Sequence, residues 1–173
     1  MARNFMCTKT DPVVETKAGK LRGFQLDGTY AFHGVKYADA KRFHQPTPVE
    51  PWEGIKNALA YGYVCPMLQQ DQPSNELMVP HRYWPLDENC QYLNIWTQHL
   101  DPNAKKPVLV WLHGGGFAAG SSIEHIAYEG ENMSKYGDVV VISLNHRLNI
   151  LGYLDLSPVS YTHLRAHETL RHL

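Results

Sequence analysis

The sequence predicts an α/β fold organised around a parallel pair of strands. Two continuous apolar runs rich in β-branched residues, 107–112 and 139–144, have the composition of strands that are covered on both faces, as in a parallel sheet. A glycine-rich loop lies between them, followed by a segment, 123–136, whose apolar residues have helical spacing. A strand, loop, helix and strand in this order imply a crossover, which connects parallel neighbours.

The segments before this pair are predicted to be antiparallel or irregular. Short β-rich stretches broken by glycine in 13–37 indicate a hairpin or meander. Prolines recur in 41–84, and because proline fixes φ and lacks an N–H, we expect an irregular wrap over the outside of the sheet. Residues 90–96 alternate in the manner of a half-buried strand and are followed by a turn at 101–103.

The end of the chain differs in character from the rest. Residues 158–173 are rich in histidine and arginine and have no apolar period. We interpret them as a tail that is foreign to the fold, and a short polar helix over 165–171 is the alternative. The structural unit is therefore expected to comprise residues 1–157.

The composition is that of a soluble globular chain, and it excludes several functional classes. Of the 173 residues, 43% are hydrophobic and 19% are charged, and the formal net charge is −1. Without an excess of positive charge there is no field to hold phosphate backbones or an anionic membrane, so neither nucleic acid nor membrane is expected as a partner. Residues 1–10 lack the apolar core of a secretory signal, which favours a cytoplasmic protein.

No metal or other cofactor is expected. The three cysteines, Cys7, Cys65 and Cys90, are too few for a disulfide scaffold. The ten histidines do not fall into a zinc-ligand spacing such as H-E-x-x-H. We interpret them as scattered surface and core residues.

A run of three glycines carries the strongest chemical signal. His113-Gly114-Gly115-Gly116-Phe117 directly follows the first apolar run. Consecutive glycines lose much conformational entropy on folding and add no side-chain packing, so they indicate a sharp turn or a close approach of the backbone to another group. The spacing fits neither G-x-G-x-x-G nor G-x-x-x-x-G-K-[ST], which argues against a phosphate cradle.

An oxyanion hole explains these glycines better. Acyl transfer develops negative charge on a former carbonyl oxygen, and main-chain amides at about 2.7–3.1 Å from that oxygen stabilise the charge. Glycine permits that approach. For the motif alone, a tight structural turn remains the alternative.

Other segments extend the pattern and resemble a known family. Besides the glycine loop, motifs occur in the order seen in type-B carboxylesterases, the cholinesterase-like family, and the resemblance runs from 12 to 157, especially to bacterial para-nitrobenzyl-esterase-type members. It implies a truncated α/β-hydrolase fold, with an N-terminal antiparallel hairpin followed by the first strands of a mostly parallel sheet. The motifs are GVKYA (34–38), RF (42–43), PW (51–52), ENCQYLNI (88–95) and NHRLNILGYL (145–154).

The resemblance also implies a function. The parent enzyme would hydrolyse small-molecule carboxylic esters through an acyl-enzyme, without a cofactor. Gly115 and Gly116 would be the oxyanion donors, Gly114 and His113 would shape the loop, and Phe117 would border the acyl pocket.

The remaining catalytic groups of such an enzyme are not found in the sequence. The mechanism needs a serine in a G-x-S-x-G elbow, then a carboxylate and a histidine base. Ser121 and Ser122 follow Gly120 but lack the second glycine of an elbow, so we do not interpret either serine as the nucleophile. The chain alone is therefore expected to be inactive.

By the same resemblance, Cys65 and Cys90 could form a disulfide, Arg42 could pair with Glu88, and Arg147 would be structural. At two positions the family more usually has other residues: His146 replaces tyrosine and Asn149 replaces glycine. Because the strand at 139–144 would lack its next neighbour, we expect it to form an apolar edge and to lower the solubility of the chain.

Two other functions share parts of this pattern. Non-catalytic cholinesterase-like proteins use the same framework to bind partner proteins, but three glycines aimed at an oxyanion favour the enzyme. Esterases similar to hormone-sensitive lipase also contain HGGG. The β-rich and proline-rich lead and the 88–95 segment favour the cholinesterase-like assignment instead.

Overall fold

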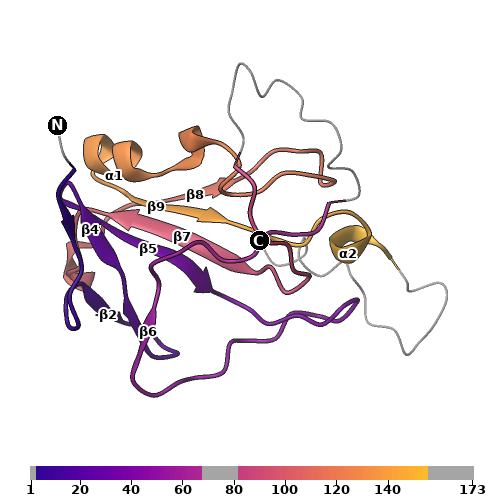
Figure 1. The fold of residues 1–173 in the computed structure, drawn as a ribbon, viewed down its shortest axis with the longest axis horizontal. Helices are drawn as coiled ribbons and strands as arrows, with labels where there is room; N and C mark the ends of the chain where they lie inside the picture. The colour runs from indigo at the N-terminus through magenta and orange to yellow at the C-terminus, as the bar shows by residue number, and fades with distance from the viewer. Residues whose placement is uncertain (1–2, 68–81, 156–173) are drawn as a thin grey trace.

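The computed structural model describes residues 3–67 and 82–155 (Figure 1). The predicted tail, 158–173, and part of the proline-rich segment lie outside the described residues. The helical elements are short, and most of the regular structure is β. The elements are β1 (Phe5–Met6), β2 (Val13–Glu15), β3 (Lys20–Arg22), β4 (Phe24–Leu26), β5 (Thr29–Lys36), β6 (Ile55–Asn57), β7 (Tyr92–Thr97), β8 (Val108–Leu112), α1 (Glu131–Gly137), β9 (Val140–Leu144) and α2 (Asn149–Tyr153), with 3-10 turns at Pro102–Ala104 and Ile126–Tyr128.

The described strands form two sheets. The larger sheet has the order β1-β4-β5-β7-β9-β8, and the smaller one has the order β2-β3-β6. Gly23 links β3 to β4 and so carries the chain from one sheet into the other. A Cβ atom at Gly23 would lie 2.3 Å from the Ala31 carbonyl oxygen, so a larger residue would push the strands apart. The expected antiparallel hairpin in 13–37 is present as β4 and β5.

The predicted crossover is confirmed. β8 and β9 are parallel and in register from Val108 opposite Val140 to Leu112 opposite Leu144. The helical part is shorter than the predicted 123–136, because a 3-10 turn and α1 are separated near Gly130. A Cβ atom on Gly130 would lie 2.6 Å from the Cβ atom of Val141, so the chain passes close to the sheet at a position where only glycine fits.

The place of β9 in the sheet corrects the prediction about the edge. β9 pairs with β7 on one side and with β8 on the other, so 140–144 is not an edge. Among the described strands, the free edge at this side is β8. All five β8 residues are exposed, from 37% at Leu109 to 59% at Val108, so the described chain does not cover this strand on both faces. An apolar run predicts a buried strand, but it does not predict the position of that strand in the sheet. Here the crossover after β8 places β9 between β8 and β7, which leaves β8 at the edge.

The described sheet is also not mostly parallel. In the six-stranded sheet every neighbouring pair is antiparallel except β8 with β9. Figure 1 shows α1 along one face of this sheet, and the contacts of α1 are with β5, β7 and β9. One core cluster of this sheet consists of Phe24, Ala31, Trp96 and Val141.

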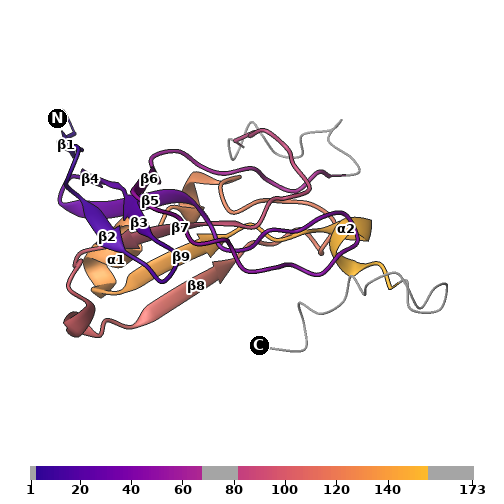
Figure 2. The ribbon, with the colours of Figure 1, turned by 90° about the horizontal axis from the view of Figure 1, so that it is seen from below.

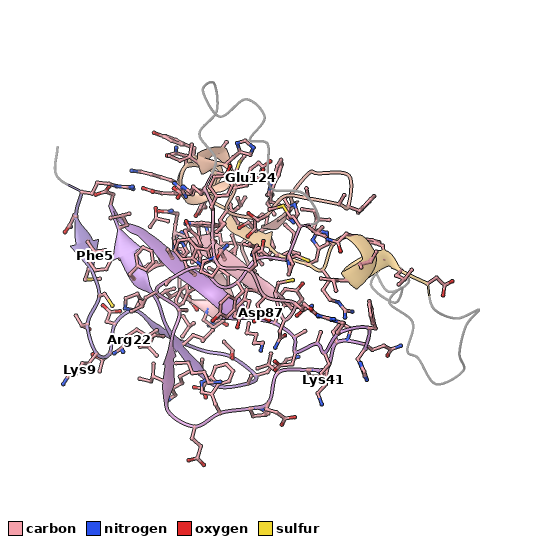
Figure 3. All side chains as sticks on the ribbon, turned by 45° about the vertical axis from the view of Figure 1, so that its right-hand side comes forward. Phe5, Lys9, Arg22, Lys41, Asp87 and Glu124 are labelled. Atoms are coloured by element: carbon pink, nitrogen blue, oxygen red, sulfur yellow. The ribbon has the colours of Figure 1, made fainter. Side chains whose placement is uncertain are left out.

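The proline-rich segment runs along the sheet, as predicted. In the described part of 41–84 the regular structure is the short strand β6, and the remainder is irregular. Figure 2 shows this segment extending lengthwise toward α2, which lies at the opposite end of the molecule from the amino terminus. Side chains crowd the middle of the molecule, whereas Lys9 and Lys41 lie at its periphery (Figure 3).

Candidate active site

The glycine loop and the start of α2 leave the sheet at the same end. His113 follows β8 directly, and Asn145 follows β9 directly. Because the two strands are parallel, both segments begin at the carboxyl ends of the strands, where open α/β sheets bind ligands. The glycine loop is therefore in the expected place for a catalytic loop.

The loop turns sharply through residues in the left-handed region of φ. Gly115, Gly116 and Phe117 have φ values of 121°, 61° and 62°. A Cβ atom on Gly115 would collide with the carbonyl group of Ala119, whereas nothing lies within 4 Å of a Cβ atom built on Gly114 or Gly116. Gly115 is therefore required by space, and Gly116 by its backbone conformation.

Hydrogen bonds orient the peptide between Gly115 and Gly116. The Gly115 carbonyl oxygen accepts from the N–H groups of Ala118 and Ala119, each at 3.1 Å. In a trans peptide the C=O and N–H groups point in opposite directions, so the Gly116 N–H faces away from this turn. The amides of Gly115 and Gly116 donate to no acceptor among residues 3–67 and 82–155. Within the described part of the chain, the loop therefore has two main-chain N–H groups without a protein acceptor.

A buried polar network holds the far end of the loop. The Ser122 N–H donates to Asn145 Oδ1 at 2.8 Å, and Asn145 Nδ2 donates to the Tyr63 carbonyl at 3.2 Å. Asn94 Nδ2 lies 3.3 Å from both Ser122 Oγ and Ser143 Oγ. Buried polar groups of this kind specify one arrangement because an unpaired partner would be destabilising.

Sequence reasoning missed this network. A signal for it was present, because Asn94 and Ser143 are polar residues at interior positions of otherwise apolar strands. The network also includes one of the two serines, Ser121 and Ser122, that follow the glycine loop and that we do not interpret as nucleophiles. Ser121 and Ser122 are both buried, and the Ser122 hydroxyl is engaged by Asn94.

An apolar groove borders the loop on the side of α2. Its volume is about 390 Å³. The exposed Phe117 ring lies 4.9 Å from the Tyr153 ring, measured between centroids. The groove is lined by Gly116, Phe117, Ala118, Asn149, Ile150, Tyr153 and Leu154.

The chain matches the model of the carboxylesterase family over residues 10–160. This chain belongs to the carboxylesterase family. It is 37% identical over 153 residues to para-nitrobenzyl esterase of Bacillus subtilis, covering 86% of this chain and 30% of that protein. It is 40% identical over 150 residues to phenmedipham hydrolase of Pseudarthrobacter oxydans, covering 84% of this chain and 30% of that protein. The chain thus spans about 30% of the length of these curated relatives.

A solved structure supports the same family. An esterase from Clostridium hathewayi, described as able to hydrolyse aliphatic aromatic polyesters, superimposes with a TM-score of 0.87 and 65% identity. The match covers 92% of this chain and 32% of that one. The α/β-hydrolase fold follows from these carboxylesterase neighbours, and the mixed sheet agrees with it.

Two histidines stack beneath the loop of this carboxylesterase chain. The rings of His113 and His146 are 4.9 Å apart with an interplanar angle of 25°, and His113 Nδ1 lies 2.8 Å from the Gly114 carbonyl oxygen. Burial lowers the pKa of His113. The pKa of His146 is lowered to about 4, mainly by burial and to a smaller extent by the neighbouring His113. Both rings are therefore neutral near pH 7.

Cys65 and Cys90, which the family resemblance indicates as a possible disulfide, are two buried free thiols in the structure. They belong to one core cluster with Leu148 and Leu151, and the Leu148 N–H lies 3.1 Å from Cys65 Sγ. The hydrogen bond between the thiols raises the pKa of Cys90, as does burial, and the same bond lowers the pKa of Cys65. Cys65 is thus the more readily ionised of the two.

Two arginines occupy the expected structural positions. Arg42 Nε lies 2.9 and 2.8 Å from the Glu88 carboxylate oxygens, but the Arg42 side chain is 64% exposed, so the pair adds little stability. Arg147 is buried, and its guanidinium donates to the His44 carbonyl at 2.8 Å. Arg147 therefore ties the proline-rich wrap to the segment after β9.

Among residues 3–67 and 82–155, no helix is both long and apolar enough to cross a bilayer. Within the same ranges, no group of three or more histidine, cysteine, aspartate or glutamate side chains is arranged to hold a metal ion.

Proposed function

We propose that this chain supplies the oxyanion-hole loop of a serine carboxylesterase that hydrolyses small-molecule esters through an acyl-enzyme. The observation that carries the proposal is the pair of Gly115 and Gly116 amides, which have no acceptor among the described residues and lie beside an apolar groove. Both glycines are exposed in the described chain, so their two N–H groups are open to a ligand such as a substrate oxygen.

The proposed chemistry follows from these donors. A serine hydroxyl adds to the ester carbonyl carbon while a histidine takes the hydroxyl proton, and the carbonyl oxygen becomes an oxyanion held by the two amides. The alcohol leaves with that proton, and water then releases the acid. Removing one oxyanion donor in such enzymes costs about 2.7–4 kcal/mol of transition-state stabilisation.

The chain supplies only part of this machinery. No G-x-S-x-G elbow occurs in the 173 residues. We therefore propose that the chain by itself does not hydrolyse esters. The groove lining is apolar, and we propose substrates in which an alkyl or aryl group lies next to the ester bond. The relatives described as para-nitrobenzyl esterase and as an esterase of aliphatic aromatic polyesters are in keeping with such groups.

A chimeric enzyme tests the proposal. Residues 10–155 of this chain would replace the matching segment of the Clostridium hathewayi esterase, whose 65% identity favours a compatible interface. The chimera should hydrolyse a short-chain nitrophenyl ester and be inactivated by an organophosphate, whereas the 173-residue chain should do neither. A folded chimera without turnover would favour the non-catalytic binding role, and turnover by the isolated chain would show that a nucleophile lies within it.

A further inference from the structure

The loop and α2 are joined through a backbone hydrogen bond between two strained residues. The Asn149 N–H donates to the Phe117 carbonyl oxygen at 2.7 Å. Phe117 has φ 62° and Asn149 has φ 49°, both in the left-handed region. A bulky residue such as phenylalanine is rarely found there, so neighbouring contacts must hold it in place.

The hydrogen bonds continue from Asn149 to Gly116 through two peptide groups. The Asn149 N–H binds the Phe117 carbonyl, and the N–H of the same peptide unit, on Ala118, donates to the Gly115 carbonyl at 3.1 Å. The N–H at the other side of the Gly115 carbonyl group belongs to Gly116. Each bonded peptide polarises the next, so the chain of bonds both aims the Gly116 N–H and strengthens it as a donor.

The side chain of Asn149 anchors this arrangement. Its Nδ2 donates to the Pro66 carbonyl at 2.8 Å, and its Oδ1 accepts from the Leu151 N–H at 3.2 Å. The next residue along the wrap, Met67, accepts the Gly120 N–H on its Sδ at 3.2 Å. Two consecutive residues of the proline-rich segment therefore bind both sides of this arrangement. Pro66 binds Asn149, and Met67 binds Gly120 at the far end of the glycine loop.

We infer that Asn149 is a positioning residue for the oxyanion hole: it fixes the Phe117 carbonyl and thereby the direction of the Gly116 amide. The inference rests on the proposed function. Asn149 lines the groove but is not itself an oxyanion donor, so we expect its loss to weaken transition-state stabilisation more than ground-state binding of the ester. Glycine also adopts a positive φ, but it lacks the two side-chain anchors.

The test compares substitutions in the chimera. Asn149→Ala should lower kcat about tenfold, a larger change than any in KM, because alanine disfavours a positive φ and loses both anchors. Asn149→Gly keeps the backbone conformation but loses both anchors, so it should recover only part of kcat. Asp138→Ala is the matched control: Asp138 also has a positive φ, 51°, but follows α1 away from the loop, so its loss should lower the thermal midpoint and leave kcat unchanged.

The outcomes separate the two proposals. If Gly115→Ala does not reduce turnover by the active chimera, the oxyanion role itself is wrong. If Gly115→Ala abolishes turnover but Asn149→Ala behaves like Asp138→Ala, only the positioning role is wrong. A second measurement does not need activity: in the 173-residue chain, the Asn149 and Ala118 amides should exchange hydrogen more slowly than the Gly116 amide. Equal exchange at all three would overturn the inference.

Discussion

A Cβ atom on Gly115 would lie 1.9 Å from the carbonyl oxygen of Ala119. The same position on Gly114 meets nothing within 4 Å. These adjacent glycines therefore differ in what a single methyl group would do, and they form a matched pair for testing the loop.

Gly115→Ala should lower kcat/KM of the chimera by about two to three orders of magnitude, the range seen when one oxyanion donor is lost. Gly114→Ala should change it by only a few-fold, because the methyl group enters open space. Ester hydrolysis under single-turnover conditions checks both. Equal losses in the two variants would indicate that the loop is sensitive to any side chain and would remove the argument for specific donors.

Burial of His33 should make the stability of the fold depend on pH. The His33 ring stacks on Tyr61 at 4.4 Å and meets Trp96 edge-on at 5.3 Å, and its Nε2 has no partner among the described residues. Burial lowers the pKa of His33 to about 4, Glu129 partly opposes this effect, and Arg82 adds slightly to it. Because the folded state disfavours the charged ring, its contribution is fully present above about pH 6.5 and is lost as the pH falls toward 4.

Between pH 7 and pH 4 the free energy of unfolding should fall by up to about 3 kcal/mol less in His33→Phe than in the unsubstituted protein, since phenylalanine keeps the ring contacts and cannot be protonated. Urea unfolding of the chimera from pH 7 to pH 4 measures it. His44→Phe, at an exposed position, controls for the loss of a histidine as such. An unchanged acid slope in His33→Phe would show that other groups carry the effect.

Oxidation should link Cys65 to Cys90 in preference to Cys7. The two buried thiols lie in one cluster, and the lowered pKa of Cys65 favours its thiolate as the attacking group. The crosslink should stabilise the fold by about 3 kcal/mol in the chain-entropy model. Peptide mapping after mild oxidation should recover the Cys65–Cys90 crosslink. The same oxidation should raise the thermal midpoint of the unsubstituted protein but not that of Cys90→Ser. Mixed disulfides that involve Cys7 at comparable yield would contradict the prediction.

The exposed β8 edge should cause the 173-residue chain to associate. Val108, Val110 and Leu112 are each more than half exposed on a strand with a free edge, and such strands pair with other chains. Val110→Lys should therefore shift the chain toward monomer in gel filtration and light scattering. Phe5→Lys on β1, the two-residue strand at the opposite edge, should have little effect. If both variants shift the chain equally, net charge rather than the β8 edge is responsible.

Local sequence patterns were enough to predict the strands around the loop and to propose a chemistry for it. Apolar runs with β-branched residues predicted β8 and β9, the intervening segment predicted their parallel pairing, and three glycines predicted a backbone that approaches a ligand. These features depend on residues close together in the chain or on motifs that occur in a recognisable order. For that reason they could be inferred without knowing any long-range contact.

Long-range packing, in contrast, sets how these elements meet. It placed β9 between β7 and β8, kept Cys65 and Cys90 as adjacent thiols, and joined Asn94, Ser122 and Asn145 into one buried network. It also brought Asn149 to the Phe117 carbonyl, more than thirty positions away by the numbering of the chain. Such contacts arise from the packing of distant segments, and because many pairings satisfy the same local preferences, local pattern alone does not select among them.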